Sequence, residues 1–331
     1  MAIPRSNSCR SEGACSSRPK SLLTVVETLR YAQGGMFRFC QATLEQPWAI
    51  FVVHQVVPPA IIHFMEKRPF WTRDSSILLG GFFVTIFLIV YIWWPLAEEV
   101  LSYIDWNGRW WLYMDWLLLG VFLFMSITIV ARANLKTDVL IVFVGVCGGL
   151  AIESWGTQTN LWHYYTAERP PLWIIPAWPI ASLSIDRITR LMDYGFRRLP
   201  SSVRSRETLM SIYWLTFASF LILMLVFISP TFDKSYTWLA LVLCILLILT
   251  PTDHRFALLT FIAGSGLGYY LELWGTTREC WTYYTNETPP FFAVLAHGMA
   301  AVAFWRAGLL VKMVLDKFKW GVRRASLNMD M

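Results

Sequence analysis

The chain has 331 residues, of which 56% are hydrophobic and only 15% are charged. Soluble domains carry about 25% charged residues, so this composition excludes an ordinary soluble protein and indicates a polytopic membrane protein. The formal net charge of +6 is unevenly placed along the chain, which bears on membrane orientation and gives no reason to expect nucleic-acid binding. The six cysteines are scattered and form no CxxC pair, which indicates neither a disulfide framework nor a zinc site.

The N-terminal segment 1–45 is polar and rich in serine and arginine. It lacks the apolar core of a secretory signal peptide. We interpret it as a disordered tail followed by a short interfacial helix near 21–40, with an organelle transit peptide as the alternative. The next segment, 46–75, contains an apolar stretch at 47–64 that carries two histidines and two prolines. This stretch is predicted to be either an extra span or a re-entrant helix.

Eight further segments are apolar enough to cross a bilayer, which requires about 20 mostly apolar residues. They are 76–97, 112–131, 138–155, 172–188, 208–229, 235–250, 256–273 and 291–311. The linker 191–207 and the tail 313–331 are rich in lysine and arginine, so both, including the C-terminus, are predicted to be cytoplasmic. Four predicted spans lie between the linker and the tail, and an even number of spans returns the chain to the same side of the membrane. The predicted fold class is therefore all-α, a polytopic membrane helix bundle of two parallel four-helix repeats, 76–190 and 208–312, with the N-terminal segment added.

The strongest pattern is a stretch of 19 residues that occurs twice. Residues 153–171 read ESWGTQTNLWHYYTAERPP, and residues 272–290 read ELWGTTRECWTYYTNETPP, with 11 identical positions at an offset of 119. Parallel repeats place both stretches on the same, non-cytoplasmic face. Gly156 and Gly275 predict a tight turn that ends the preceding helix. The Pro-Pro pair at the end of each stretch predicts the start of the next helix.

Two glycines precede the first glutamate of each stretch at intervals of four. These residues are Gly145, Gly149 and Glu153 in the first half, and Gly264, Gly268 and Glu272 in the second. Residues four apart share one face of a helix, and glycines at this spacing let two membrane helices approach closely. We therefore expect each glutamate to end a glycine stripe on the interface between the repeats, with packing as the main role of the glycines.

Glu153 and Glu272 are the candidate catalytic residues, because ionisable groups within spans are expensive and often functional. One could stay protonated and act as an acid, with the other or a tyrosine as the base. The alternative is that both only bond indole, phenol or amide groups of their loops. His297 corresponds to Trp178 at the same offset, and it is a candidate proton donor or acceptor or, alternatively, a satisfied interface histidine. No histidine cluster indicates a metal, and no cofactor is predicted.

The aromatic residues of the two stretches, together with Trp178, are candidate substrate-binding residues. They are Trp155, Trp162, Tyr164, Tyr165 and Trp178 in the first half, and Trp274, Trp281, Tyr283 and Tyr284 in the second. The alternative is an aromatic belt at the level of the lipid headgroups. A belt, however, does not require the same Glu-x-Trp-Gly-Thr start in both halves.

The duplicated stretch resembles the Glu…Gly-x-x-Thr…Tyr-x-Tyr…Pro pattern of membrane-integral carotenoid-biosynthesis proteins of the hydratase and lycopene-cyclase type. The residues that carry this resemblance are Glu153, Gly156, Thr157, Tyr164, Tyr165 and Pro171. Pro95, Glu98 and Glu99 are similar to the Pro-x-Glu-Glu of lycopene cyclases, with an alanine inserted. The Trp-x-Tyr-Tyr and Pro-Pro elements depart from the pattern. The resemblance implies metal-independent protonation of a polyene or isoprenoid double bond by membrane carboxylates.

Two functions follow as hypotheses. In the first, an aromatic pocket between the repeats holds a long apolar isoprenoid, a glutamate protonates it, and aromatic faces stabilise the developing carbocation. In the second, the protein is not an enzyme but a transporter, binding module or scaffold for a lipid, quinone or pigment. The predicted partner is a membrane lipid or isoprenoid, and a homo-oligomer or a second membrane protein remains an open alternative.

Overall fold

The structure is a computed structural model that describes residues 71–250 and 253–329, all within the compact unit Pro69–Met331. The predicted tail 1–45 and the stretch 47–64 lie outside the described residues. Within the described ranges the chain forms nine α-helices, three short 3-10 turns and one two-stranded ribbon. The prediction of a mostly helical protein is therefore confirmed.

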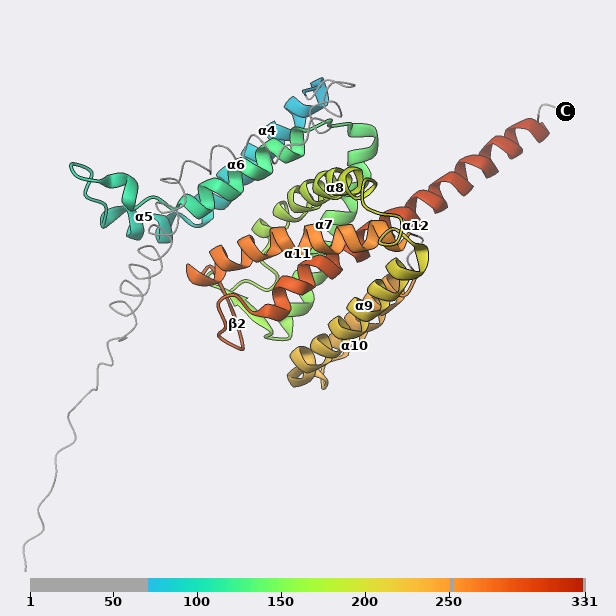
Figure 1. Ribbon diagram of the computed structural model, residues 1–331. Helices are drawn as coiled ribbons and strands as arrows, with labels where there is room; N and C mark the ends of the chain where they lie inside the picture. The colour runs from blue at the N-terminus through green and yellow to red at the C-terminus, as the bar shows by residue number, and fades with distance from the viewer. Residues whose placement is uncertain (1–70, 251–252, 330–331) are drawn as a thin grey trace, which may run out of the picture. The chain divides into compact units, whose positions relative to one another are not determined.

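Each predicted span coincides with one helix, and α5 is additional (Figure 1). The helices are α4 (Arg73–Ile92), α5 (Trp94–Ser102), α6 (Trp116–Val130), α7 (Leu135–Gln158), α8 (Ala177–Phe196), α9 (Arg206–Ile228), α10 (Ser235–Ile248), α11 (His254–Thr277) and α12 (Phe291–Met329). The strands are β1 (Trp162–Tyr164) and β2 (Trp281–Tyr283), and the 3-10 turns are η1 (Trp110–Leu112), η2 (Leu172–Ile174) and η3 (Ser229–Thr231). Helices α4, α7, α9, α11 and α12 are long and apolar enough to cross a membrane, which indicates a multi-pass membrane protein.

Helix α8 differs from the predicted span 172–188. It begins only at Ala177, after the 3-10 turn η2, whereas α12 begins directly after its Pro-Pro pair. It also continues to Phe196 through a charged second half. There Arg187 Nη2 donates to Asp138 Oδ2 of α7 at 2.6 Å, and both side chains are largely buried. A buried charge needs such a partner, so this ion pair lets α8 carry charge inside the bundle.

The starts of α7 and α11 are fixed by capping side chains. The Asn134 side-chain oxygen accepts from the Lys136 amide, and that of Asp253 accepts from the Phe256 amide, each at 3.1 Å. Such caps satisfy backbone donors that the first turn of a helix leaves free. The two capping residues lie 119 residues apart, which is the offset of the duplicated stretch.

Helices α7, α8, α11 and α12 pack together in the middle of the described unit (Figure 1). Helix α6 packs against α8 and α11, and α10 packs against α12 and α7. Helix α4 lies along α6, while α9 contacts α11 and α12. The outer faces of α4, α6, α9 and α10 expose many large apolar side chains, as expected for helices that face lipid.

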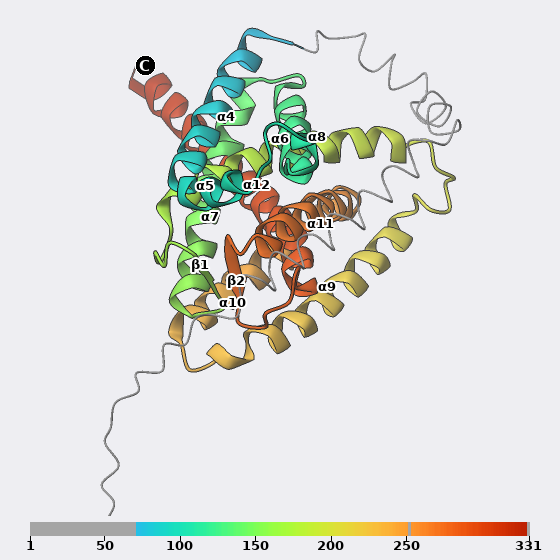
Figure 2. The same cartoon turned by 90° about the vertical axis from the view of Figure 1, so that its left-hand side faces the viewer.

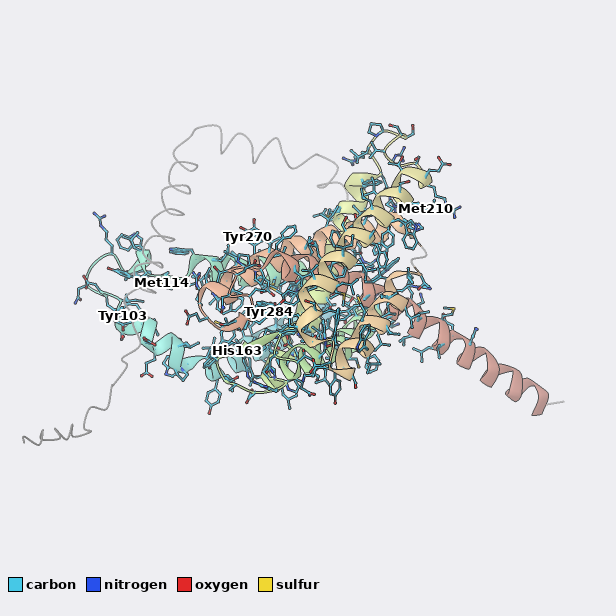
Figure 3. All side chains as sticks on the ribbon, turned by 90° about the horizontal axis from the view of Figure 1, so that it is seen from below. Tyr103, Met114, His163, Met210, Tyr270 and Tyr284 are labelled. Carbon is cyan, nitrogen blue, oxygen red and sulfur yellow. The ribbon has the colours of Figure 1, made fainter. Side chains whose placement is uncertain are left out.

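Strands β1 and β2 come from the two copies of the duplicated stretch, and they pair antiparallel (Figure 2). Trp162 lies opposite Tyr283, and Tyr164 lies opposite Trp281, so equivalent residues exchange places across the ribbon. The central pair, His163 and Thr282, joins two equivalent positions. His163 lies on the exposed face of the ribbon (Figure 3). The duplicated stretches therefore contact one another directly.

Candidate functional site

The first site is the carboxylate of Glu153, which is only 3% exposed near the end of α7. Three donors surround it. Tyr164 Oη donates to Oε1 at 2.9 Å, Trp178 Nε1 donates to the same oxygen at 3.1 Å, and Trp162 Nε1 donates to Oε2 at 3.1 Å. The indole N–H groups can only donate, so the glutamate oxygens act as acceptors.

The second site repeats this arrangement around Glu272 of α11, which is 2% exposed. Tyr283 Oη donates to Oε1 at 2.9 Å, and Trp281 Nε1 donates to Oε2 at 2.9 Å. The third partner is His297 of α12, whose Nε2 lies 2.8 Å from Oε1. The second site thus contains a titratable ring where the first site has an indole.

Trp178 and His297 connect the two sites. They occupy equivalent positions on α8 and α12, and their rings stack with centroids 5.9 Å apart and planes 19° apart. Among the described residues the two glutamates share no hydrogen-bond partner, and each binds the tryptophan and the tyrosine of its own stretch. The open question of whether the carboxylates bind each other or their own loops is thereby answered in favour of their own loops.

The two buried tyrosines remain protonated donors over a wide pH range. Burial raises the pKa of Tyr164 well above its ordinary value, and the neighbouring Glu153 carboxylate raises it further. Burial and the Glu272 carboxylate do the same for the pKa of Tyr283. Both effects disfavour a phenolate, since its charge would be desolvated and would repel the glutamate.

The spacing of the glycine stripes predicts that they lie at the interface between the two halves. This prediction is wrong. A Cβ at Gly149 would lie 2.4 Å from the Trp178 ring, and one at Gly268 would lie 2.5 Å from His297 Cβ. Each stripe thus faces the next helix of its own half and lets the third donor approach its glutamate. Spacing along one helix indicates a close approach but does not identify the partner helix.

Gly156 and Gly275 do not form the helix-ending turns that the sequence predicts. Neither ends its helix, since α7 continues to Gln158 and α11 to Thr277, and the described glycines include none with a positive φ. Instead the ring of Trp162 lies against Gly156, where a Cβ would approach it to 1.8 Å. The missing side chain makes room for the indole that binds the glutamate.

The other four candidate aromatic residues hold the stretches onto neighbouring helices. Trp155 Nε1 donates to Thr237 Oγ1 of α10 at 3.3 Å, and Trp274 Nε1 donates to Asp115 Oδ2 at the start of α6 at 2.8 Å. The last two act through their hydroxyls on backbone carbonyls: Tyr165 donates to Ile92, and Tyr284 donates to Phe227. These contacts support a structural role for the four residues.

Two residues near the second site were missed by the sequence analysis. Asp115 caps α6 by accepting from the Leu118 amide, and it also receives two hydrogen bonds from Arg278, at 3.0 and 3.1 Å. An acidic residue directly before an apolar run is a capping signal that could have found it. Trp93 stacks on Trp274, with centroids 4.8 Å apart. No pattern indicated Trp93, because it has no counterpart in the second half.

One cavity borders the second site. It has a volume of about 90 Å³ and lies between α4, α6, α8 and α11. Trp93, Trp274 and Trp281 form part of its wall, but neither glutamate lines it. It is therefore not the pocket shared by both carboxylates that the sequence led us to expect.

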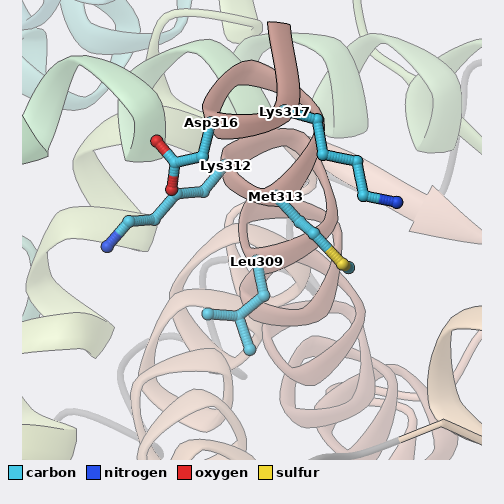
Figure 4. A pocket seen from close by; sticks show the side chains of 5 residues that line it. All are labelled: Leu309, Lys312, Met313, Asp316 and Lys317. Carbon is cyan, nitrogen blue, oxygen red and sulfur yellow. The ribbon is translucent and has the colours of Figure 1, made fainter. Parts of the chain in front are cut away.

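A larger hollow of about 440 Å³ surrounds exposed residues of α12, among them Lys312, Met313 and Lys317 (Figure 4). It begins at Leu309, about 18 Å along the helix from His297 at 1.5 Å per residue. This hollow does not belong to the candidate site.

The segment Pro95–Glu99, which is similar to a lycopene-cyclase motif, does not reach the site. It lies on α5, where both Glu98 and Glu99 are exposed. Within 71–250 and 253–329, no group of three or more histidine, cysteine, aspartate or glutamate residues could hold a metal ion.

Comparison of the chain with protein-family models, curated proteins and solved structures finds no match. The resemblance to carotenoid-biosynthesis proteins thus depends on short sequence motifs alone. The function has to be argued from the geometry of the two sites.

Cys280 gives a first test of how tightly the second stretch is enclosed. Its side chain is buried, its carbonyl accepts from the Tyr165 amide, and burial raises the pKa of its thiol to about 12. The thiolate is the reactive form, so at pH 8 the folded protein is expected to leave Cys280 unlabelled by N-ethylmaleimide. Unfolding in detergent should restore labelling. Mass spectrometry of the Cys280 peptide measures both, and equal labelling before and after unfolding would contradict the burial.

Proposed function

We propose that the chain is built from two parallel four-helix repeats, α4, α6, α7 and α8, and α9, α10, α11 and α12. The symmetric register of β1 with β2 supports this arrangement, as do the matched helix caps and the matched glutamate sites. Contacts between the two proposed repeats support the arrangement as well. Helix α6 of the first packs against α11 of the second, and the equivalent helix α10 of the second packs against α7 of the first. A parallel repeat of this kind places both glutamate sites at the same side of the membrane.

We further propose that the protein binds a long apolar isoprenoid or lipid and transfers a proton to or from it at the second site. The observation that carries this proposal is the pair of Glu272 and His297, whose atoms are 2.8 Å apart. A carboxylate that is hydrogen-bonded to an imidazole fixes the orientation of the ring, as in general acid–base catalysis. The His297 side chain is 22% exposed whereas the Glu272 side chain is only 3% exposed, so the imidazole is the more accessible group.

In the proposed reaction His297 gives its proton to a carbon of a substrate double bond. A C–H bond forms, the π bond is lost, and the resulting carbocation is stabilised by the faces of neighbouring indoles. The imidazole that has given up its proton would then take one back. In a cyclisation this proton comes from a carbon next to the cation after ring closure, and in a hydration it comes from the water molecule that adds to the cation. Glu272 positions the imidazole, and Glu153, which has only indole and phenol partners, is assigned a structural role.

A second candidate function is binding or transport of a lipid, quinone or pigment without chemistry. The observation that favours it is that both glutamates are almost fully buried and that each already has three hydrogen-bond partners. Such an arrangement also suits a purely structural role, in which each glutamate fixes its stretch against its helix.

The variant His297→Trp separates the two candidates, because it gives the second site the donor that the first site already has. Gly268 leaves space beside the side chain at position 297, just as Gly149 leaves space beside the Trp178 ring. We expect full-length wild-type protein in liposomes containing lycopene, or in a lipid extract of the host membrane, to form a product detected by mass spectrometry.

His297→Trp is expected to lower that rate by about 10²- to 10⁴-fold, the usual contribution of a general acid or base. The matched control is His163→Trp, the same exchange at the exposed position of the ribbon, which should keep the wild-type rate. Equal rates in wild type and His297→Trp, or no product from either lipid source, would reject the enzyme in favour of the binding function.

A further inference from the structure

The connection between α4 and α6 is much longer than its counterpart in the second half. It has 23 residues, 93–115, whereas only the six residues 229–234 connect α9 to α10. Helices of a bundle are usually joined by about 2–8 residues, and connections longer than about 12 residues commonly carry a function. We call residues 94–115 the arm. It contains α5 and η1, and it projects from the edge of the helix bundle, as Tyr103 in Figure 3 shows.

The arm is rich in aromatic residues, and all of them are exposed. Among its described side chains Ile104 is the one buried residue. Large exposed apolar patches mark sites of interaction with a protein or a membrane. Packing inside the bundle does not account for these rings, which therefore require a partner outside the chain. The six aromatic residues, each 41–60% exposed, are Trp94, Tyr103, Trp106, Trp110, Trp111 and Tyr113.

Both ends of the arm are held by the second duplicated stretch. Trp93, directly before the arm, stacks on Trp274, and Asp115 at the end of the arm forms an ion pair with Arg278 at 3.0 Å. The rings are therefore presented from a fixed base. The same contacts place the arm on the side of the membrane where the duplicated stretches lie, which the distribution of basic residues predicts to be the non-cytoplasmic side.

The exposed rings of the arm continue the lipid-facing surface of α4 and α6. Tyr91 near the end of α4 and Trp116 at the start of α6 are both exposed, and apolar side chains such as Phe87 and Leu123 are exposed farther along the two helices. Helix α4 has 20 residues, which is about the length that crosses the hydrocarbon core of a bilayer. The arm begins where that helix ends, and this is the level of the lipid headgroups.

The composition of the arm favours lipid headgroups over a protein partner. Tryptophan and tyrosine are enriched where membrane meets water, because the ring is apolar and its N–H or O–H group is polar. Glu98, Glu99 and Asp105 are exposed in the same segment, whereas acidic residues are depleted in protein interfaces. The rings of Trp110 and Trp111 are inclined at 82° to each other, so they do not form one flat face.

We propose that the arm lies in the headgroup layer of the non-cytoplasmic leaflet, with its indole and phenol rings inserted among the lipids. The lipid surface that fits it is zwitterionic, because the acidic residues of the arm outnumber Arg109, its only basic residue, and an anionic surface would repel them. Since the arm is attached to Trp274 and Arg278, it also sets the depth of the second duplicated stretch in the membrane. This inference does not depend on the proposed reaction.

The test measures the membrane depth of a nitroxide label at Asn107, an exposed position inside the arm. The residue is replaced by p-acetylphenylalanine, whose ketone takes the label and leaves the cysteines unmodified. The full-length protein is placed in phosphatidylcholine liposomes. Power saturation in electron paramagnetic resonance then compares collisions of the label with oxygen, which concentrates in hydrocarbon, and with a nickel chelate, which stays in water and is supplied on both sides.

Two further label positions calibrate the depth. A label at Phe87, which is exposed on α4, reports the hydrocarbon, and a label at Ser201, which is exposed in the linker 191–207, reports water. We expect the label at Asn107 to lie at a depth between these two.

A triple serine variant tests whether the rings hold the arm in lipid. Combined Trp106→Ser, Trp110→Ser and Trp111→Ser should shift the label at Asn107 to the oxygen and nickel accessibility measured at Ser201. Tyrosine at the same three positions keeps rings that suit the interface, and this matched control should keep the original depth. The label at Phe87 should stay in hydrocarbon in both variants, which shows that the bundle still spans the bilayer.

Three results would overturn the proposal. The first is a label at Asn107 that is as accessible to nickel as the label at Ser201 when all the tryptophans are present. The second is an unchanged depth in the serine variant, because the rings would then not hold the arm in lipid. The third is a label shielded from both reagents, with spin–spin broadening that disappears on dilution with unlabelled protein, since a second copy of the chain would then cover the arm.

Discussion

Alanine at position 156 is expected to prevent the first stretch from folding onto α7. A Cβ there would lie 1.8 Å from the Trp162 ring, so the ring must leave the helix and give up its hydrogen bond to Glu153. Overpacking together with loss of a hydrogen bond to a charged group should lower the free energy of unfolding by roughly 3–5 kcal/mol. Gly275→Ala should behave in the same way, because its Cβ would lie 2.0 Å from the Trp281 ring. Thermal unfolding of the purified variants measures both effects.

Gly266→Ala is the matched control for these variants. Gly266 lies on α11, the helix that also carries Gly275, but a Cβ there would meet no atom within 4 Å. Alanine is the better helix former by about 1 kcal/mol, so this variant should be neutral or slightly more stable than wild type. If Gly156→Ala and Gly275→Ala proved as stable as Gly266→Ala, the placement of the two indoles would be wrong.

Glu153→Ala is expected to be the most damaging change at the first site. It leaves two buried donors, on Trp162 and Tyr164, and the half-buried indole of Trp178 without their acceptor. Each unsatisfied donor costs about 1–3 kcal/mol, so the variant should be destabilised by at least several kcal/mol or fail to accumulate as folded protein. Glu153→Gln keeps one acceptor oxygen and should fall between alanine and wild type. Unfolding temperature and the yield of monodisperse protein are the measurements.

Glu272→Ala is expected to cost less than Glu153→Ala, although the two sites look alike. Its third partner is His297, whose neutral ring has one donor and one acceptor nitrogen and can adapt to a lost partner, whereas the indole of Trp178 can only donate. Equal losses in the two alanine variants would contradict the distinction between the sites on which the proposed function depends.

The helices were predictable because their signals are local. Long apolar runs gave the positions of eight helices, and Asn134 and Asp253 marked two starts through their own side chains. The ribbon was not predictable, since three-residue strands are too short to show an alternating pattern. The role of Gly156 was also hidden. A glycine near the end of an apolar run looks like a helix stop, and only the position of the Trp162 ring reveals a contact surface.

Duplication made the glutamates and their aromatic partners visible in the sequence, but it did not reveal which groups pair. Spacing predicts that Glu153 and Trp162 are near the same membrane face, and the hydrogen bond between them follows only from the fold. Residues that have no counterpart in the other half were the hardest to identify from the sequence. Trp93 and Asp115 belong to a segment that has no equivalent between α9 and α10, so repetition gave no indication of them.

The pairing of β1 with β2 bears on how this architecture arose. Its register is centred on His163 and Thr282, which are the same position in two copies of one unit. Two identical strands would pair in this register across a two-fold axis, which is the isologous contact of a C₂ homodimer. A single half expressed alone would present an open strand edge, and the partner that fits that edge is another molecule of itself.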